Sequence, residues 1–220
     1  MTPLESFFKN FLEPLSYFVY ALVFLLRLNR QRSLLNGILF GYYAFAALLL
    51  LFASIIAMAE EQADNTWMYN IFYLVTICVL SYYFYGLLTT KIKKATVTIL
   101  LVTNVVIFIW YDIFLGHFFK AFNDQEYAIC FISIVMYALL YFHQLLRNVT
   151  EQDILFQFDF WLVSGYLVYF LGSFIIILFY RSVDIDDSGD VWALQNIILF
   201  LSSVVTLAGY LKIPSPKRTY

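Results

Sequence analysis

The sequence predicts an all-α integral membrane protein: a single seven-transmembrane-helix bundle with its N-terminus outside the cell and its C-terminus in the cytoplasm. The first reason is composition. Of the 220 residues, 63% are hydrophobic and only 13% are charged, with a mean hydropathy of +0.80. A typical soluble domain has about 25% charged residues, so a chain this apolar could not cover a water-exposed surface. The other two reasons are the apolar runs and the distribution of basic residues.

Seven apolar runs are long enough to cross a bilayer as helices. A helix needs about 20 mostly apolar residues to span a hydrocarbon core of roughly 30 Å. The runs lack the strict alternation that a membrane β-strand requires. Short loops separate them, so residues 1–220 are expected to form one transmembrane domain with no separate soluble part. We expect the spans at about residues 11–26, 33–59, 67–88, 95–115, 127–146, 160–180 and 191–211.

The residues between the runs justify each span in order. The first is followed by Arg27 and Arg30 and by no small-residue cleavage site, so we expect a retained helix rather than a signal peptide. An acidic loop at 60–64 separates the second span from the third, and lysines separate the third from the fourth. The segment 147–159 joins the fifth to the sixth, and a second acidic loop at 181–190 precedes the seventh.

Lysine and arginine are concentrated on one side of the predicted bundle. Ten of the 13 fall on that side and three on the other. Because short loops rich in these residues stay in the cytoplasm, the bias predicts the orientation of the chain. The ten are Arg27, Arg30, Arg32, Lys91, Lys93, Lys94, Arg147, Lys212, Lys217 and Arg218, and the three are Lys9, Lys120 and Arg181.

No group of residues in the sequence is typical of a catalytic centre. A catalytic zinc needs about three protein ligands, but His117 and His143 are predicted on opposite sides of the membrane. Ser164, near His143, could form a nucleophile–base pair, although a lone Ser-Gly in an apolar helix is more often a packing contact. The seventh span has no lysine to bind retinal. We expect no catalytic residue, metal or cofactor and, with a calculated pI of about 5.6, no nucleic-acid partner.

Polar residues recur on one face of three spans, since residues seven or eight apart return to the same side of a helix. Asp112 is the one acidic residue that lies clearly within a span. One interpretation is interhelical hydrogen bonds, worth about 0.6 kcal/mol each, together with an aromatic belt. The other is an outward-facing cavity for a small or lipid-like ligand, anchored by Asp112. The candidate ligand-binding residues are Asp112, Tyr111, Asn104, Asn70, Tyr73, Gln195, Asn196 and Trp192.

Small residues predict close helix packing in two spans. Gly37 and Gly41 form a G-x-x-x-G pattern in the second span, and Gly165 and Gly172 share a face of the sixth. Such residues let two helix backbones approach each other closely. We expect them to pack inside the bundle, and an interface between copies in a homo-oligomer is the alternative.

The sixth and seventh spans carry Phe-Trp-Leu-Val-Ser-Gly-Tyr-Leu-Val-Tyr at 160–169 and Val-Trp-Ala-Leu-Gln-Asn-Ile-Ile at 191–198. In these segments and in topology the chain resembles small heptahelical membrane modules of bacterial signalling systems, of the sort associated with histidine kinases. The resemblance implies a protein of the plasma (inner) membrane. Only about nine residues follow the last span, so output would pass through a cytoplasmic or membrane signalling partner.

Three functional hypotheses follow from the sequence. The first is a non-enzymatic sensor or receptor-like signalling subunit that recognises something in the outer half of the bilayer and acts through a partner chain. The second is a transporter or channel subunit for a small or lipid-like solute, in which the polar faces line a path. The third is a membrane enzyme acting on lipid, for which no nucleophile, base or metal site is evident.

Overall fold

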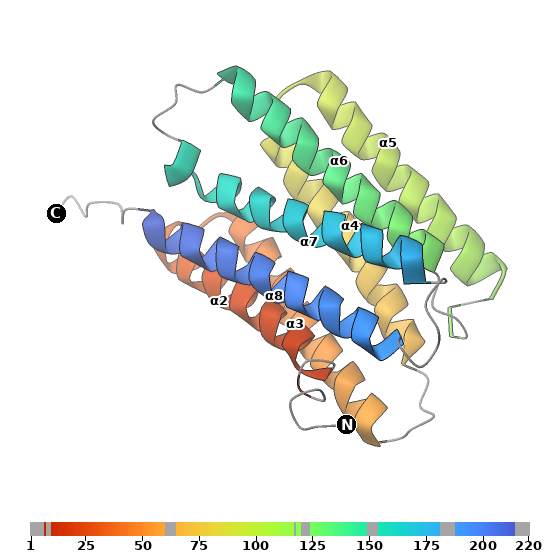
Figure 1. Ribbon diagram of the computed structural model, residues 1–220. Helices are drawn as coiled ribbons and strands as arrows, with labels where there is room; N and C mark the ends of the chain where they lie inside the picture. The colour runs from red at the N-terminus through yellow and green to blue at the C-terminus, as the bar shows by residue number, and fades with distance from the viewer. Residues whose placement is uncertain are drawn as a thin grey trace.

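The computed structural model describes residues 7, 10–59, 65–116, 118–119, 124–148, 154–180 and 188–213, and this part of the chain is helical apart from short connections (Figure 1). A helix covers each of the seven expected spans. The helices are α2 (Leu12–Arg30), α3 (Leu34–Ala59), α4 (Thr66–Leu87), α5 (Lys91–Phe108), α6 (Asp124–Asn148), α7 (Phe158–Tyr180) and α8 (Ser188–Lys212), with a π-helical segment η1 (Ile109–Phe114) continuing α5 and a short 3₁₀ helix η2 (Ile154–Phe156) before α7.

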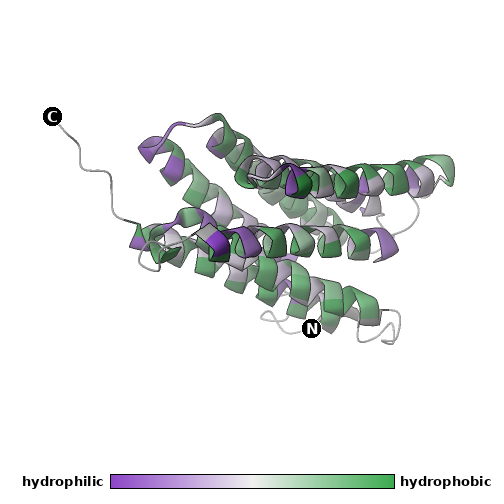
Figure 2. Cartoon of the chain, turned by 90° about the horizontal axis from the view of Figure 1, so that it is seen from above, coloured by the Kyte–Doolittle hydropathy of each residue, from purple (hydrophilic) through white to green (hydrophobic). Residues whose placement is uncertain are grey.

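All seven long helices are long and apolar enough to cross a membrane. Their outward faces carry large apolar side chains, among them Leu48, Ile113 and Leu146, which are 69%, 62% and 81% exposed. Figure 2 shows hydrophobic residues along the helices and hydrophilic ones mostly toward the helix ends. A soluble monomer rarely exposes so much contiguous apolar surface. In the described part of the chain, the prediction of an all-α protein with seven helices long and apolar enough to span a membrane is therefore confirmed, and these helices have the character of an integral membrane protein.

The helices are arranged as a closed ring with one helix outside it. Each of α2, α3, α4, α6, α7 and α8 packs on the next in that order, and α8 packs back on α2. The remaining helix, α5, lies at the side of the bundle and packs on α4 and α6 within the described part of the chain (Figure 1). Only four of its residues are buried: Lys93, Val97, Asn104 and Phe108. The centre of the ring is thus enclosed by six helices, while α5 is the least buried of the seven.

One end of the bundle carries all eight of the described lysines and arginines, and we call it the basic end. Side-chain hydrogen bonds stabilise the short loops between helices at this end. Gln144 of α6 accepts hydrogen bonds from the backbone N–H and the hydroxyl of Thr89, both at 2.9 Å, and donates to the carbonyl of Leu87 at 3.2 Å. Ser33 caps α3 by accepting from the N–H of Asn36 at 3.1 Å. The expected opposite-side basic residues Lys9, Lys120 and Arg181 lie outside the described residues, as do the acidic loop at 60–64 and residues 181–187 of the second.

Glycines differ in what they contact. A Cβ added at Gly165 would lie 2.8 Å from Thr206 Oγ1 and 3.0 Å from the Ser202 carbonyl, and one at Gly172 would lie 3.1 Å from Ile198. Both neighbours are on α8, so this face of α7 allows the two helices to pack closely. At Gly37 and Gly41 no atom lies within 4 Å of the added Cβ. The G-x-x-x-G face of α3 therefore makes no close contact with the other described helices.

Candidate functional site

A buried polar cluster lies between α4, α5 and α6, in the half of the bundle away from the basic end. The Tyr73 hydroxyl donates to Asn104 Oδ1 at 3.0 Å. Asn104 Nδ2 donates in turn to Ser133 Oγ at 3.0 Å, and Ser133 donates to the carbonyl of Ile129 at 2.7 Å. Asn104 is completely buried. In this series of hydrogen bonds each side chain donates to the next, and buried polar groups on three helices find partners that a lipid environment would not provide. We call Tyr73, Asn104 and Ser133 the Asn104 cluster.

Asp112 lies near the Asn104 cluster, in a π-helical segment of the backbone. It is 1% exposed and lies within η1, where α5 widens into a π-helical turn. The Asp112 and Glu126 carboxyls are both within electrostatic reach of the Tyr73 hydroxyl. Short π-helical segments inside α-helices occur frequently at functional sites. The sequence predicted an uninterrupted helix to residue 115, so the π-helical turn is new information from the structure.

The segment after η1 is attached to α4. Asn70 Nδ2 donates to the Phe118 carbonyl at 2.9 Å, and the Phe118 N–H donates to the Asp112 carbonyl at 3.3 Å. Gly116 has φ +70°, a left-handed conformation that glycine adopts without the cost of a Cβ. Tyr111 is half-buried on η1. Four of the eight candidate residues, Asn70, Tyr73, Asn104 and Asp112, therefore come together in one region.

Tyr111 lies on η1 next to Asp112, and the three candidates on α8 lie elsewhere. Gln195 and Asn196 are buried on α8, and Trp192 is partly exposed there. Because α8 packs on α2 and α7, whereas the Asn104 cluster lies on α4, α5 and α6, the polar faces predicted from the sequence form two separate groups. Periodicity shows which residues share a face of one helix, but not which helices that face meets.

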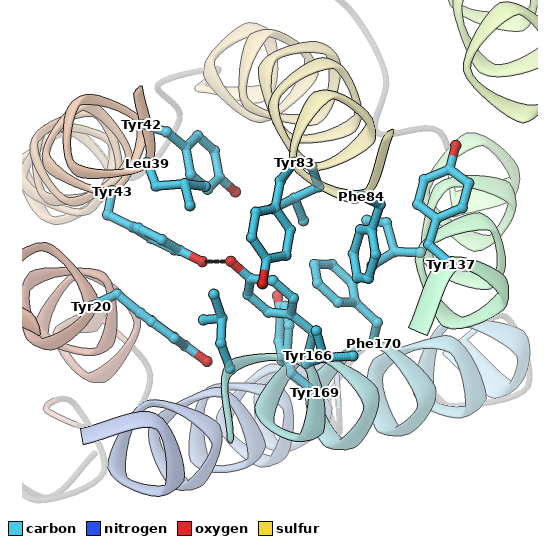
Figure 3. Close-up of a cluster of buried hydrophobic side chains, with 14 of the residues drawn as sticks. Tyr20, Leu39, Tyr42, Tyr43, Tyr83, Phe84, Tyr137, Tyr166, Tyr169 and Phe170 are labelled. Atoms are coloured by element: carbon cyan, nitrogen blue, oxygen red, sulfur yellow. Dashed lines mark hydrogen bonds between the residues drawn. The ribbon is translucent and has the colours of Figure 1, made fainter. Parts of the chain in front are cut away.

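Tyrosines fill the centre of the ring, a feature that sequence reasoning did not anticipate (Figure 3). The Tyr43 and Tyr166 hydroxyls bond each other across it, joining α3 to α7. Tyr20 stacks on Tyr43 with ring centroids 4.7 Å apart and bonds Ser202 of α8 at 2.5 Å. We call this group the tyrosine core: its members are Tyr17, Tyr20, Tyr42, Tyr43, Tyr166 and Tyr169.

The tyrosine core leaves almost no free space. The cavity that its residues line has a volume of about 10 Å³, which is room for about one water molecule. The pairs Tyr17/Tyr20 and Tyr166/Tyr169 are each three residues apart, so each pair lies on one face of its helix. That spacing is the signal from which the core could have been found, although only the ring arrangement shows that these faces meet.

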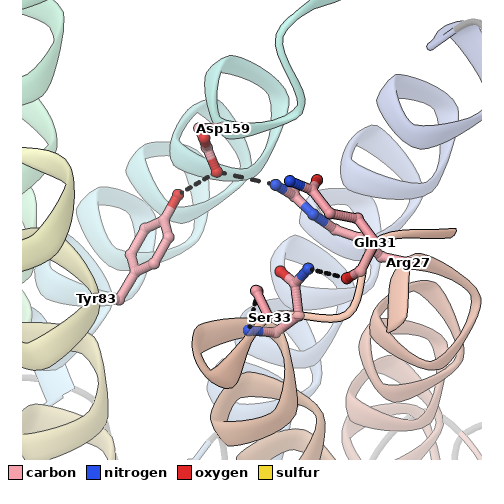
Figure 4. Close-up of polar contacts among 6 residues, drawn as sticks. Arg27, Gln31, Ser33, Tyr83 and Asp159 are labelled. Atoms are coloured by element: carbon pink, nitrogen blue, oxygen red, sulfur yellow. Dashed lines mark hydrogen bonds and ion pairs between the residues drawn. The ribbon is translucent and has the colours of Figure 1, made fainter. Parts of the chain in front are cut away.

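A polar contact connects the tyrosine core to the basic end (Figure 4). The Tyr83 hydroxyl donates to Asp159 Oδ1 at 3.0 Å, and the same oxygen lies 3.8 Å from Arg27 Nη1. Tyr83 also packs on Tyr166 of the core, with ring centroids 6.2 Å apart. Asp159 therefore interacts with both the centre of the ring and a basic residue at its end.

The described residues do not assemble the catalytic or metal groups considered from the sequence. Ser164 donates its hydroxyl to the Phe160 carbonyl at 2.7 Å, four residues back on its own helix, and His143 is exposed. Within the described ranges no three His, Cys, Asp or Glu side chains are placed to hold a metal ion. His117 lies outside those ranges.

Comparison of the chain with protein-family models, curated proteins and solved structures finds no match.

Proposed function

We propose that the protein is a non-enzymatic, receptor-like membrane subunit. In this proposal a small or lipid-like molecule is sensed at the Asn104 cluster, and the change is passed through the bundle to a partner at the basic end. The packed centre of the ring carries the proposal. A transporter path along the ring axis would need polar, open space, whereas the tyrosine core leaves a cavity of only about 10 Å³.

The position of α5 supports a sensing role for the Asn104 cluster. This helix lies outside the ring and has few buried residues, and elements with few buried contacts move at the lowest free-energy cost. Its end is the π-helical η1, which carries buried Asp112. A ligand that changes the surroundings of Asp112 would therefore act on the helix that is least restrained by packing.

A continuous set of contacts leads from α5 to the basic end. Tyr137 of α6 donates to the Val97 carbonyl of α5 at 3.2 Å and packs on Phe84 of α4 at 5.5 Å between ring centroids. Phe84 packs on Tyr166, which lies against Tyr83. Tyr83 donates to Asp159 at the basic end. Tightly packed networks of this kind can carry energetic coupling between distant sites.

The proposed role includes an orientation and a location. The basic end would face the cytoplasm of a bacterial cell, because loops rich in lysine and arginine remain there. The N-terminus would be outside, and the protein would lie in the plasma membrane beside a signalling partner. The eight described basic residues at one end of the bundle support this orientation.

Hydrogen–deuterium exchange of the full chain in lipid nanodiscs tests the proposed coupling. We compare the wild type with Asp112→Asn, which replaces the carboxyl with an amide of nearly the same shape. A receptor-like protein should show altered amide exchange both around η1 and at residues 154–160 of the basic end. Thr98→Ala is the control, since the Thr98 hydroxyl, among the described residues, bonds the Lys94 carbonyl of its own helix, and it should leave both regions unchanged.

Two results would contradict the proposal. One is an Asp112→Asn effect confined to η1, with no change at the basic end. The other is flux of protons, potassium ions or fluorescent lipid in proteoliposomes that exceeds the flux in protein-free liposomes and disappears in Asp112→Asn. The second result would favour the transporter or channel hypothesis.

A further inference from the structure

An open cavity at the basic end has the chemistry of an anion site. Its volume is about 420 Å³, within the range of roughly 300–1,000 Å³ that small-molecule sites occupy. It lies where α2 and α8 end and α7 begins, away from the Asn104 cluster. Its walls are formed by Arg27, Arg30, Gln31, Phe156, Phe158, Tyr210 and Ile213.

Both arginines of the cavity are held by aromatic rings. The Arg27 guanidinium lies over the Phe158 ring at 4.0 Å, and that of Arg30 lies over the Tyr210 ring at 4.6 Å. A guanidinium donates hydrogen bonds in its own plane, so a ring against its face leaves the donor edge available. This preorganises the arginines for an oxyanion, which they bind best edge-on and bidentately.

Positive charge at the cavity is only partly balanced. Asp159 is the acidic partner of Arg27, but its nearest oxygen is 3.8 Å from Nη1 and already accepts from Tyr83. Among the described residues, the buried Arg27 Nη1 has no hydrogen-bond partner. In the part of the chain that the structure describes, Arg30 has no acidic partner. Among the described residues, the two guanidinium groups are therefore accompanied by a single carboxylate, which pairs with Arg27 alone, so the described wall of the cavity carries a net positive charge.

The first turn of α7 adds to the attraction for an anion. Phe156 and Phe158 place the beginning of α7 at the cavity wall, and the N-terminus of a helix carries a partial positive charge. Apart from Gln31, the remaining wall is aromatic or apolar: Phe158 and Tyr210 are almost fully buried, and Ile213 also lines the cavity. An apolar wall beside two arginines fits an anionic group carried on a hydrophobic molecule or bound at a membrane surface.

We infer that this cavity binds a phosphate-bearing anion through Arg27 and Arg30. The phosphate is either the headgroup of an anionic phospholipid or part of a soluble phosphate compound. Basic pockets between transmembrane helices commonly bind such headgroups. The site is separate from the Asn104 cluster, so the inference does not depend on the proposed receptor role.

Thermal unfolding of the purified full chain in non-ionic detergent tests the site with three probes at constant ionic strength. The probes are phosphatidylglycerol, zwitterionic phosphatidylcholine and inorganic phosphate. Arg30→Gln is the test variant, since Arg30 is exposed and its replacement should not prevent folding. Arg32→Gln is the matched control, because it removes the same charge two residues further on and Arg32 does not line the cavity.

We expect phosphatidylglycerol to raise the unfolding temperature of the wild type. Its apparent affinity should fall at least about tenfold in Arg30→Gln, as expected for the loss of charge-assisted hydrogen bonds, and should change less than about twofold in Arg32→Gln. A shift with phosphatidylglycerol alone identifies a lipid headgroup, and a shift with inorganic phosphate as well identifies a soluble phosphate source. The inference is overturned if neither anion shifts the wild type, if phosphatidylcholine acts as strongly, or if both variants lose the shift equally.

Discussion

The buried Tyr20 hydroxyl finds its hydrogen-bond partner inside the bundle, on Ser202 of α8. The hydrogen bonds of Ser202 identify which of the two hydroxyls is the donor. Its single hydroxyl proton goes to the Gly165 carbonyl at 2.6 Å, and a serine has only one proton to donate. The Tyr20 hydroxyl, 2.5 Å from Ser202 Oγ, must therefore be the donor in that pair.

Replacing Tyr20 by Phe should lower the free energy of unfolding by about 0.5–1.5 kcal/mol, the usual worth of one buried hydrogen bond. The loss is modest because Ser202 keeps its bond to Gly165 and is not left unsatisfied. Tyr20→Ala should cost about 3–5 kcal/mol, since it also opens a cavity in the tyrosine core. Unfolding of the full chain in mixed micelles with increasing denaturing detergent measures both values.

Tyr82→Phe is the matched control for Tyr20→Phe. Tyr82 is 51% exposed on the outer face of α4, so removing its hydroxyl should change the free energy of unfolding by less than about 0.5 kcal/mol. Equal effects at the two positions would mean that the tyrosine core is not held together by its hydroxyl bonds.

At the scale of elements, three glycines allow α7 and α8 to pack closely against each other. Gly165 and Gly172 of α7 lie against α8, and Gly209 of α8 lies against the Trp161 side chain of α7. Lys212 Nζ in turn lies 4.6 Å from the centre of the Trp161 ring. This packing brings Ser202 within reach of the Gly165 carbonyl, and so it also positions the partner of Tyr20.

We expect Gly165→Ala and Gly37→Ala to have opposite effects on stability. At Gly165 the new methyl group would lie 3.0 Å from the Ser202 backbone carbonyl, and such overpacking typically costs about 1–3 kcal/mol. At Gly37 nothing lies within 4 Å, so alanine should gain up to about 1 kcal/mol of helix propensity. The same detergent unfolding experiment compares them, and a stabilising Gly165→Ala would contradict the α7–α8 packing.

At the scale of the whole molecule, the closed ring and the peripheral α5 divide the bundle into a rigid and a less restrained part. The ring centre is packed with tyrosines, whereas α5 rests on α4 and α6 among the described helices. A bundle built in this way can respond at one side without opening a path through its centre. That difference is the structural basis of the proposed receptor-like role.

Reporter fusions test the proposed orientation of the whole bundle. A green fluorescent protein fused after Tyr220 should fluoresce, and alkaline phosphatase at the same position should be inactive, because the basic end is expected in the cytoplasm. Insertion of the same reporters between residues 61 and 62 should give the reverse pattern, since an odd number of spans separates that loop from the C-terminus. Active phosphatase after Tyr220 would mean that the orientation is inverted.

The sequence by itself determined the number and positions of the helices. A span needs about 20 apolar residues in a row, which is local information, and polar residues such as Asn104 and Asp112 are conspicuous because burying them in lipid is costly. The same local information identified Gly165 as a packing residue. It could not indicate that Gly37 makes no close contact with the other described helices.

Only the tertiary structure decided which helices are neighbours. It joined Asn70, Tyr73, Asn104 and Asp112 across α4 and α5 while leaving Gln195 and Asn196 on α8. It also gathered tyrosines from separate helices into one core and paired Arg27 and Arg30 with the rings of α7 and α8. The physical reason is that spanning a bilayer depends on each segment's own composition, whereas the order of helices depends on side-chain fit between segments far apart in the chain.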